Sequence, residues 1–585
     1  MLFTAPQWPL RGQPFWVVAV VSHRVDASLS LVAGADAGTP PAGGRHGGPP
    51  YFWATHVMDP GARAYVARLT RDRACGGADL ATKDVVLRQS PLPPAVPPRT
   101  GLWHTRVAWS RSYEDLYSAW IQLLFEAPLG AQPSFSALHE VLRDSSRNFL
   151  FDYLGSAEDE QGVTMKPDCA DLPYFLRAYF ASKIGLPFGW STCTRGEGGL
   201  PPTCSSFATN EDPFPPIDGK AQPLPPWANP SGDAGAPLSA AMRLGEFFRT
   251  TLADSVQSGA GRTRADDEET DYYPVSLSVD SLRPGTIFAD PYGHVLVVAQ
   301  RVPQDSSSGG VLLAVDGQPD STVARKRFWR GNFVFAVDPA RGSAGFKRFR
   351  PIVRDKTTGK LRRVKNAEIA DYSATDQYSG GTEGFYDKMD DVLSPLPVDP
   401  MQALLDTVQA LDEQVKTREI SVDNGRRFLE TAKAPAEMPD GATIFETNGD
   451  WEDFSTPSRD LRLLIAIDVA EAFPARVARR PERYAMPAGE SADRVRADLD
   501  ARLAGELRDR KFSYVRSDGS SWELSLRDVV AREAALEVAY DPNDCVEVRW
   551  GAPPSSDEVS TCRAHAPAEQ VAKMATYRDW FHDRR

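Results

Sequence analysis

Residues 166–177, KPDCADLPYFLR, place a cysteine at the predicted start of a helix. Asp168 is of a residue type that caps helix N-termini, so we expect Cys169 in the first turn. Backbone N–H groups without intrahelical partners, together with the positive end of the helix dipole, stabilise a thiolate there. The apolar residues behind the cysteine follow helical spacing: Leu172, Phe175, Leu176 and Tyr179. The sequence therefore predicts a helix over 168–183 that packs into a core and presents Cys169 as a nucleophile.

A second segment, residues 282–298, LRPGTIFADPYGHVLVV, supplies a candidate base. A Pro-Gly turn leads into one strand, and His294 begins the next apolar strand. A histidine in this position can point across at a helix N-terminus and act as a general base. The strand that follows ends in Asp316, whose carboxylate can orient the imidazole, although an Asp before a glycine is also a common turn former. Gln318 is the alternative orienting residue.

At these residues the chain resembles the NlpC/P60 family of cysteine peptidases and amidases. In that family an Asp-Cys-Ser-Gly helix start carries the nucleophile, and a Pro-Gly-Asp strand leads to Gly-His-Val with the base. Residues 168–171, DCAD, keep the first two positions and lose Ser-Gly, and residues 284–286, PGT, have threonine in place of the Asp. Residues 293–295, GHV, match fully. The resemblance covers roughly residues 165–320.

The resemblance implies a papain-like fold and a site made of Cys169, His294 and Asp316. It also implies cleavage of amide bonds in bacterial cell-wall peptides, with a peptide or peptidoglycan substrate and no cofactor. Two alternatives stay open. One is a catalytically inactive papain-like scaffold or binding protein. The other is a transglutaminase-like acyl transferase, which uses the same order of Cys, His and Asp, although its Gly-x-Cys and His-Ala-Trp signatures are missing here.

The length of 585 residues indicates several domains, because single cores stop growing at roughly 250–300 residues. Short β-rich runs predict an N-terminal β-sandwich accessory domain over 1–95, which ends in a proline-rich linker. The hydrolase domain is expected over 100–350, with a long insertion at 191–275. Helical periodicity predicts a mainly helical C-terminal domain over 356–585, with a hairpin at 512–526. The predicted fold class is α+β and multidomain.

The proline-rich half of the insertion, residues 201–237, has too few apolar residues for a core of its own. It is tethered at both ends to the catalytic helix and strands, so we expect it to lie near the cleft. It is interpreted as a lid or specificity wall, with a surface excursion of no function as the alternative. Trimming residues 206–232 is expected to preserve the fold and to change the preference among peptide substrates.

Charge and composition argue against several classes of partner. The formal charge of −13 repels phosphate backbones, so nucleic acid is not expected to bind. The eight histidines show no HExxH or Cys-pair spacing, and we predict no metal site. No run approaches the ~20 apolar residues that span a bilayer, and we expect no membrane span. The sequence does not indicate an oligomeric state.

Cysteine spacing bears on the compartment. Cys193 with Cys204, and Cys545 with Cys562, are spaced to close short disulfide loops, or they are ordinary thiols of a cytosolic protein. The 48 prolines and 44 glycines in long loops slightly favour an exported protein, periplasmic or extracellular, over a cytoplasmic one. The first residues, MLFT, lack the basic and apolar regions of a secretory signal, so such a protein would need a leader that this sequence does not contain.

Overall fold

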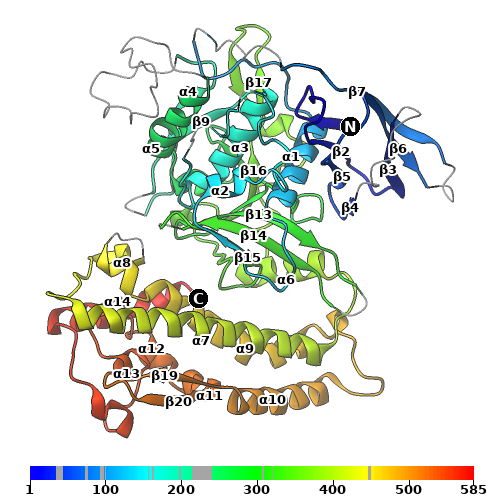
Figure 1. Cartoon of the computed structure of the whole chain (residues 1–585). Helices are drawn as coiled ribbons and strands as arrows, with labels where there is room; N and C mark the ends of the chain where they lie inside the picture. Colours follow the sequence, from blue (N-terminus) through cyan, green and yellow to red (C-terminus); the bar gives the residue numbers. More distant parts are fainter. Residues whose placement is uncertain are drawn as a thin grey trace. The chain divides into compact units, whose positions relative to one another are not determined.

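The computed structural model describes residues 1–33, 44–72, 77–91, 98, 100–155, 157–160, 164–196, 199–213, 240–305, 308–318, 320–445 and 449–585. These residues form a mixed structure of helices and several antiparallel sheets, which divides into two compact units (Figure 1). The predicted α+β multidomain class is confirmed at this level. The first unit holds most of the chain up to Leu393, and the second holds Trp329–Val334 and Ser394–Arg585.

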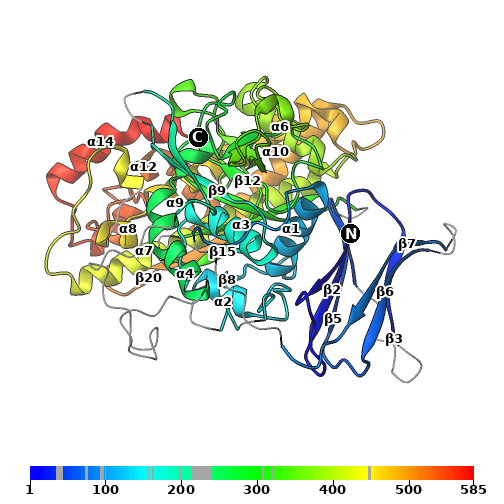
Figure 2. The same cartoon turned by 90° about the horizontal axis from the view of Figure 1, so that it is seen from above.

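The N-terminal region of the first unit consists of two antiparallel sheets. One has the order β1-β2-β5-β4 and the other β3-β6-β7. Their bounds are Leu2–Ala5 (β1), Phe15–Val21 (β2), Ala27–Ala33 (β3), Gly44–His46 (β4), Tyr51–Val57 (β5), Ala64–Arg71 (β6) and Asp79–Val86 (β7). The sheets face each other in Figure 2 and share one core, to which Phe15, Leu29, Trp53 and Leu69 belong. Alternate residues of β3 are buried, as expected for a strand with one face on a core.

The other face of the β1-β2-β5-β4 sheet is buried as well. Val18 and Val20 of β2 join the main core of the unit together with Leu116 and Trp120 of α1, which spans Arg111–Leu124. The N-terminal sheets therefore belong to the same compact unit as the helices that follow them, although a proline-rich segment separates the two in sequence.

A seven-stranded antiparallel sheet forms the centre of the first unit, with the order β11-β16-β12-β13-β14-β15-β8. Its strands are Ser134–Phe135 (β8), Tyr272–Pro274 (β11), Ile287–Ala289 (β12), Val295–Val302 (β13), Val311–Gly317 (β14), Val323–Arg327 (β15) and Gly345–Phe349 (β16). Helix α3, Asp171–Ile184, is buried along its whole length and packs against β13 and β14. The short helix α2, Leu138–Arg143, lies next to β8.

The predicted insertion is partly regular structure. Strands β9 (Gly189–Cys193) and β10 (Cys204–Thr209) form a two-stranded ribbon. Further on lie α4 (Ala240–Glu246), a π-helix (Phe247–Leu252), α5 (Ala253–Ser255) and a 3-10 helix (Ser258–Arg262). Phe247 and Phe248 are buried in the main core, against Trp190 and Phe175 respectively. The centre of the expected lid, residues 214–239, lies outside the described residues.

The boundary between the two units lies after Leu393, whereas the sequence pattern placed it near residue 356. The strands β17 (Ile352–Arg354) and β18 (Leu361–Arg363) and the helix α6 (Gly381–Leu393) belong to the first unit. The reason is the apolar face of α6: Phe385 stacks on Phe335 at 3.9 Å and contacts Phe346 of the central sheet. Helical periodicity shows that α6 has an apolar face but does not show which core receives it.

The second unit is mainly helical. Its helices are α7 (Pro400–Thr431), α8 (Asp450–Phe454), α9 (Pro457–Arg479), α10 (Ala492–Asp509), α11 (Leu526–Ala531), α12 (Glu533–Leu536), α13 (Val546–Arg549) and α14 (Ala568–Asp583). Strands β19 (Lys511–Val515) and β20 (Ser521–Ser525) pair in the predicted hairpin. Arg418 and Asp460 form a fully buried ion pair at 2.6 Å between α7 and α9.

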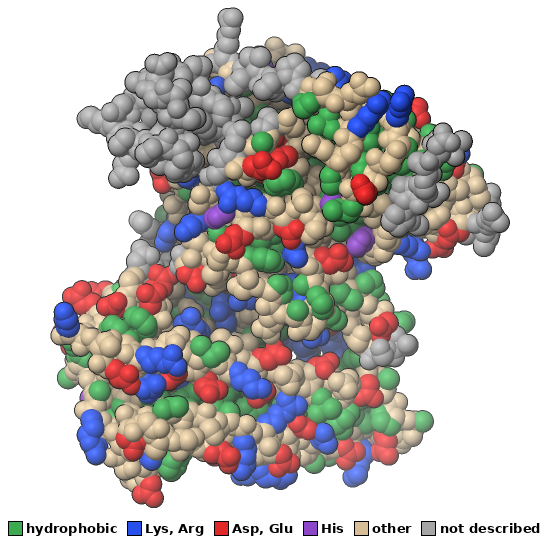
Figure 3. All heavy atoms as spheres, in the orientation of Figure 1, with side chains coloured by type: hydrophobic (Ala, Val, Ile, Leu, Met, Phe, Trp, Pro, Cys, Tyr) green, Lys and Arg blue, Asp and Glu red, His purple; other side chains and the backbone are tan. Residues whose placement is uncertain are grey.

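Charged side chains of both signs are interspersed over the second unit on the face shown in Figure 3. Many of them pair one helical turn apart, for example Lys416 with Asp412 at 2.6 Å and Arg494 with Asp498 at 3.2 Å. Such spacing is typical of solvated helix faces. Within the described part of the chain, none of the helices combines the length and the apolar character needed to cross a membrane.

Candidate active site

Cys169 lies in a turn that leads into α3. Oδ1 of Asp168 accepts hydrogen bonds from the backbone N–H groups of Ala170 (2.8 Å) and Asp171 (2.9 Å). The carbonyl oxygen of Asp168 accepts the N–H of Leu172 at 3.1 Å. Asp168 thus caps the helix start as predicted, while the regular helix begins at Asp171. Among the described residues, no acceptor receives the backbone N–H of Cys169.

Close backbone packing fixes this turn against strand β14. A Cβ atom at Gly317 would lie 2.4 Å from the carbonyl oxygen of Asp168 and 2.8 Å from that of Pro167. Only a residue without a side chain fits at this distance. Since Asp316 directly precedes Gly317, the contact holds the carboxylate of β14 beside the helix start that bears Cys169.

His294 is positioned by a tight turn between β12 and β13. Oδ1 of Asp290 accepts the backbone N–H groups of Tyr292 (2.8 Å) and His294 (2.9 Å). Gly293 has a φ of 114°, in the region that favours glycine. The thiol of Cys169 points at the carbonyl oxygen of Gly293, with a distance of 3.8 Å from sulfur to oxygen. The thiol therefore lies against the residue that precedes the histidine.

The imidazole of His294 lies between a carboxylate and the thiol. Its Nε2 is 2.9 Å from Oδ2 of Asp316, whose side chain is buried, while the imidazole is 23% exposed. Burial alone would lower the pKa of His294. The negative charge of Cys169 and hydrogen bonds to Asp316 and Cys169 outweigh burial and raise this pKa to about 10. The three predicted site residues are thus brought together, in an arrangement that favours the protonated form of His294.

Asp171 lies two residues after Cys169, at the position where NlpC/P60 enzymes have glycine. Burial and the neighbouring charges of Asp168 and Asp254 raise the pKa of its carboxyl group to about 8, although a hydrogen bond from the Asp168 N–H opposes them. At neutral pH the group is therefore largely protonated. It adds little negative charge beside the Cys169 thiolate.

Two other sequence expectations have clear outcomes. The backbone N–H of Gln318 donates to the carbonyl oxygen of Thr322 at 2.8 Å, in the turn after β14, while Asp316 contacts the imidazole.

Residues 206–209 belong to β10, and the buried side chain of Asn210 accepts the N–H of Phe188 and donates to the Trp103 carbonyl. Trimming from residue 206 would remove these contacts, which corrects the prediction that this deletion preserves the fold.

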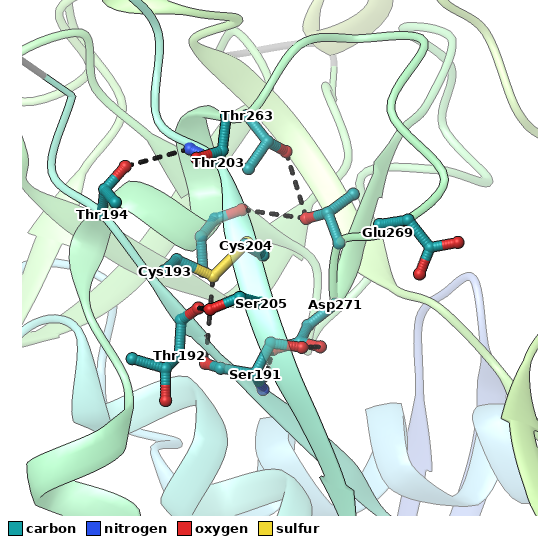
Figure 4. The surroundings of a disulfide bond; sticks show 12 residues. Ser191, Thr192, Cys193, Thr194, Thr203, Cys204, Ser205, Thr263, Glu269 and Asp271 are labelled. Atoms are coloured by element: carbon teal, nitrogen blue, oxygen red, sulfur yellow. Dashed lines mark hydrogen bonds between the residues drawn. A yellow bond between two sulfur atoms is a disulfide. The ribbon is translucent and has the colours of Figure 1, made fainter.

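The two cysteine pairs for which the spacing left disulfides and free thiols open are both disulfides: Cys193–Cys204 and Cys545–Cys562. Figure 4 shows the first, which joins β9 to β10 above Ser191 and Asp271. Of the cysteines in the described residues, Cys169 alone is a free thiol.

Possible metal ligands gather at two places in the described part of the chain. One group contains the bridged Cys545 and Cys562. The other consists of Asp152, Glu158 and Asp159, and Nζ of Lys183 lies 2.5 Å from carboxylate oxygens of the latter two. The ammonium group of Lys183 therefore balances part of the negative charge of this cluster.

Sequence patterns did not reveal two residues that shape the site, Asp290 and Gly317. Asp290 had a local signal, because an Asp that opens a turn and ends before a strand often accepts backbone N–H groups. Gly317 had none, since its contact with Asp168 joins segments distant in sequence. No family model, curated protein or solved structure matches the chain. The geometry of Cys169, His294 and Asp316 is therefore the basis for assigning a function.

Proposed function

We propose that this protein is a cysteine hydrolase, a peptidase or amidase, with Cys169 as the nucleophile. One observation carries the proposal: Asp316 binds Nε2 of His294 at 2.9 Å, and the Cys169 thiol lies against the carbonyl oxygen of Gly293, the residue directly before this histidine. A nucleophile, a base and a residue that orients the base are the three parts of acyl-transfer sites of this kind. Cys169 is a free thiol at a capped helix start. The positive end of a helix dipole favours the thiolate form of a cysteine in this position.

The reaction would proceed in two stages. The Cys169 thiolate attacks the amide carbonyl carbon, and the oxyanion that forms accepts a hydrogen bond from the Cys169 backbone N–H. The imidazolium of His294 gives its proton to the leaving amine as the C–N bond breaks, which leaves a thioester. Neutral His294 then removes a proton from water, and the resulting hydroxide attacks the thioester and releases the acid and the thiolate.

The wider identity is part of the same proposal. A buried helix that carries the nucleophile at its start and packs on an antiparallel sheet supports a papain-like domain. The resemblance of residues 165–320 to NlpC/P60 enzymes supports cell-wall peptides as substrates. The two disulfides support an exported, oxidising location, because disulfides seldom persist in the cytosol.

Hydrolysis of peptidoglycan stem peptides by the purified full chain tests the proposal. Cys169→Ala and Cys169→Ser should abolish hydrolysis while the chain stays folded, and Cys75→Ala, at the other cysteine outside the two bridges, is the control that should keep full activity. Iodoacetamide should modify Cys169 near pH 6 faster than it modifies a model thiol, because only the thiolate reacts. Full activity in Cys169→Ala would exclude the mechanism, and slow labelling would favour an inactive scaffold.

A further inference from the structure

A cavity lies in the first unit, between the β1-β2-β5-β4 sheet and the segment after α2. Its volume is about 440 Å³, and aromatic side chains line it: Trp8, Trp16, Phe149, Phe151 and Tyr153. Trp8 is 52% exposed, and the ring of Trp16 stacks on His56 with centroids 4.4 Å apart and an interplanar angle of 7°. Trp8 is therefore the accessible ring of the lining, while Phe149 and Tyr153 are buried and form a preformed wall.

The charge at this cavity has one sign. Asp152 and Glu160 are its acidic lining residues, and none of the described lining residues is Lys or Arg. Burial lowers the pKa of His56, which keeps that imidazole neutral at physiological pH. A ligand in the cavity would thus meet carboxylates and the negative faces of aromatic rings, and no lining cation.

The carboxylate cluster behind the cavity has more acidic than basic groups. Asp152, Glu158 and Asp159 have ligand atoms within 4.8 Å of one another, and Lys183 pairs with the latter two. Nε of Arg143 donates a hydrogen bond to the backbone carbonyl oxygen of Asp159 at 3.4 Å. Burial and repulsion from Glu158 and Asp159 raise the pKa of Asp152 to about 6, against a hydrogen bond from the Asp159 N–H and the charge of Lys183. Asp152 is therefore a carboxylate that a further cation would stabilise.

We propose that this cavity binds an organic cation, an alkylated ammonium group that seats on the aromatic rings with Asp152 and Glu160 beside it. Aromatic faces attract such cations through the ring quadrupole, and the alkyl groups bury apolar surface at the same time. Adjacent carboxylates add a charge that a neutral ligand of the same shape cannot use. This combination selects for charge and shape together.

The cavity is separate from the proposed catalytic site. Lys183, which pairs with the acidic cluster, lies near the C-terminal end of α3, whereas Cys169 precedes its N-terminal end. A helix of 14 residues is about 21 Å long at 1.5 Å per residue. Binding of a cation here does not depend on Cys169 chemistry, so the two proposals can fail independently.

Choline and its neutral isostere 3,3-dimethylbutan-1-ol are suitable probes, because they share a shape and differ in charge. Binding to the full chain can be followed by calorimetry and by the fluorescence of the tryptophans. Choline should bind saturably, and roughly tenfold more tightly than the isostere. Equal affinity for the two probes, or no saturable binding of choline, would overturn the proposal.

Variants then locate the binding. Asp152→Asn with Glu160→Gln should weaken choline binding roughly tenfold and leave the isostere unaffected. Trp8→Ala should weaken the binding of both probes. Asp84→Asn, an exposed acid on β7 outside the cavity, is the matched control and should change neither. Because Glu160 and Trp8 are exposed, their single variants remain informative even if Asp152→Asn lowers the melting temperature. Unchanged choline binding in both single variants would assign it to another place and refute the proposal.

Discussion

Nε2 of His294 lies 2.9 Å from Oδ2 of Asp316, across two neighbouring strands of the central sheet. His294 directly precedes β13, and Asp316 lies near the end of β14, which pairs antiparallel with β13. The start of β13 and the end of β14 therefore lie at the same end of this strand pair, beside the start of α3. This placement makes the role of each side chain testable on its own.

Asp316→Asn should leave the fold intact and lower kcat by about 10²–10⁴-fold, since the amide cannot stabilise the imidazolium and can hold the wrong tautomer. KM should change little, because the carboxylate contacts the imidazole and not the substrate. Steady-state kinetics on a stem peptide would measure both values. Asp320→Asn, an exposed turn residue on the same hairpin, is the control. A kcat equal to that of the control would remove Asp316 from the mechanism.

His294 should keep its proton well above neutral pH, because Cys169 and Asp316 raise its pKa from the ordinary 6.5 to about 10. A folded-state pKa above the unfolded one contributes stability that is complete below about pH 6.5 and is lost as the pH rises through 10. Cys169→Ala removes the thiolate charge, so it should lower the pKa of His294. NMR titration of the imidazole in both proteins would measure the change. An identical titration in the variant would show that the two groups do not form an ion pair.

Gly317→Ala should disturb the site although the residue takes no part in the chemistry. The added Cβ would lie 2.4 Å from the Asp168 carbonyl oxygen, so the turn that holds Cys169 must move. We expect a loss of roughly 1–3 kcal/mol in the free energy of unfolding and a fall in kcat. Gly61→Ala, where a Cβ meets nothing within 4 Å, is the matched control. Denaturant unfolding and kinetics on both variants would decide, and wild-type behaviour of Gly317→Ala would mean that this contact does not position Cys169.

The sequence was informative where the signal is local. The cap at Asp168, the apolar strand after His294 and the turn at Ser517-Asp518-Gly519 each depend on a few adjacent residues, and each element forms as predicted. A helix cap, the period of a strand and a turn are properties of short segments, so they can be recognised in the sequence without the tertiary structure.

The sequence was uninformative where the cause is a contact between distant segments. Helix α6 was not predicted from the sequence, and the stacking of Phe385 on Phe335, which joins this helix to the first unit, has no local signal, so the boundary was placed near residue 356 instead of after Leu393. The β9–β10 ribbon was hidden in a segment rich in Pro, Gly and Ser, because a disulfide and core contacts such as that of Asn210 stabilise it more than strand propensity does. The protonation of Asp171 depends on burial, which no spacing rule encodes.

The Cys193–Cys204 bridge connects to the candidate active site through a series of close contacts. A Cβ at Gly259 of the 3-10 helix would lie 1.9 Å from the carbonyl oxygen of Thr194, the residue after Cys193. At the end of the same short helix, Arg262 donates to the carbonyl oxygen of Pro291 at 3.3 Å. Pro291 belongs to the turn that positions His294. Greater mobility of the β9–β10 ribbon should therefore disturb the position of the His294 imidazole.

Replacing both members of this bridge, in Cys193→Ser with Cys204→Ser, should destabilise the first unit by roughly 3 kcal/mol, as expected for reopening a short loop in the unfolded chain. It should also lower kcat, because the 3-10 helix supports the His294 turn. The matched control is Cys545→Ser with Cys562→Ser, which removes the bridge of the second unit. That variant should lose comparable stability in its own unit and keep full hydrolysis. Calorimetry of the full chain, with kinetics at the same temperature, separates the two effects. If both double variants keep wild-type kcat, the ribbon does not support the catalytic turn, and if neither loses stability, the bridges do not form.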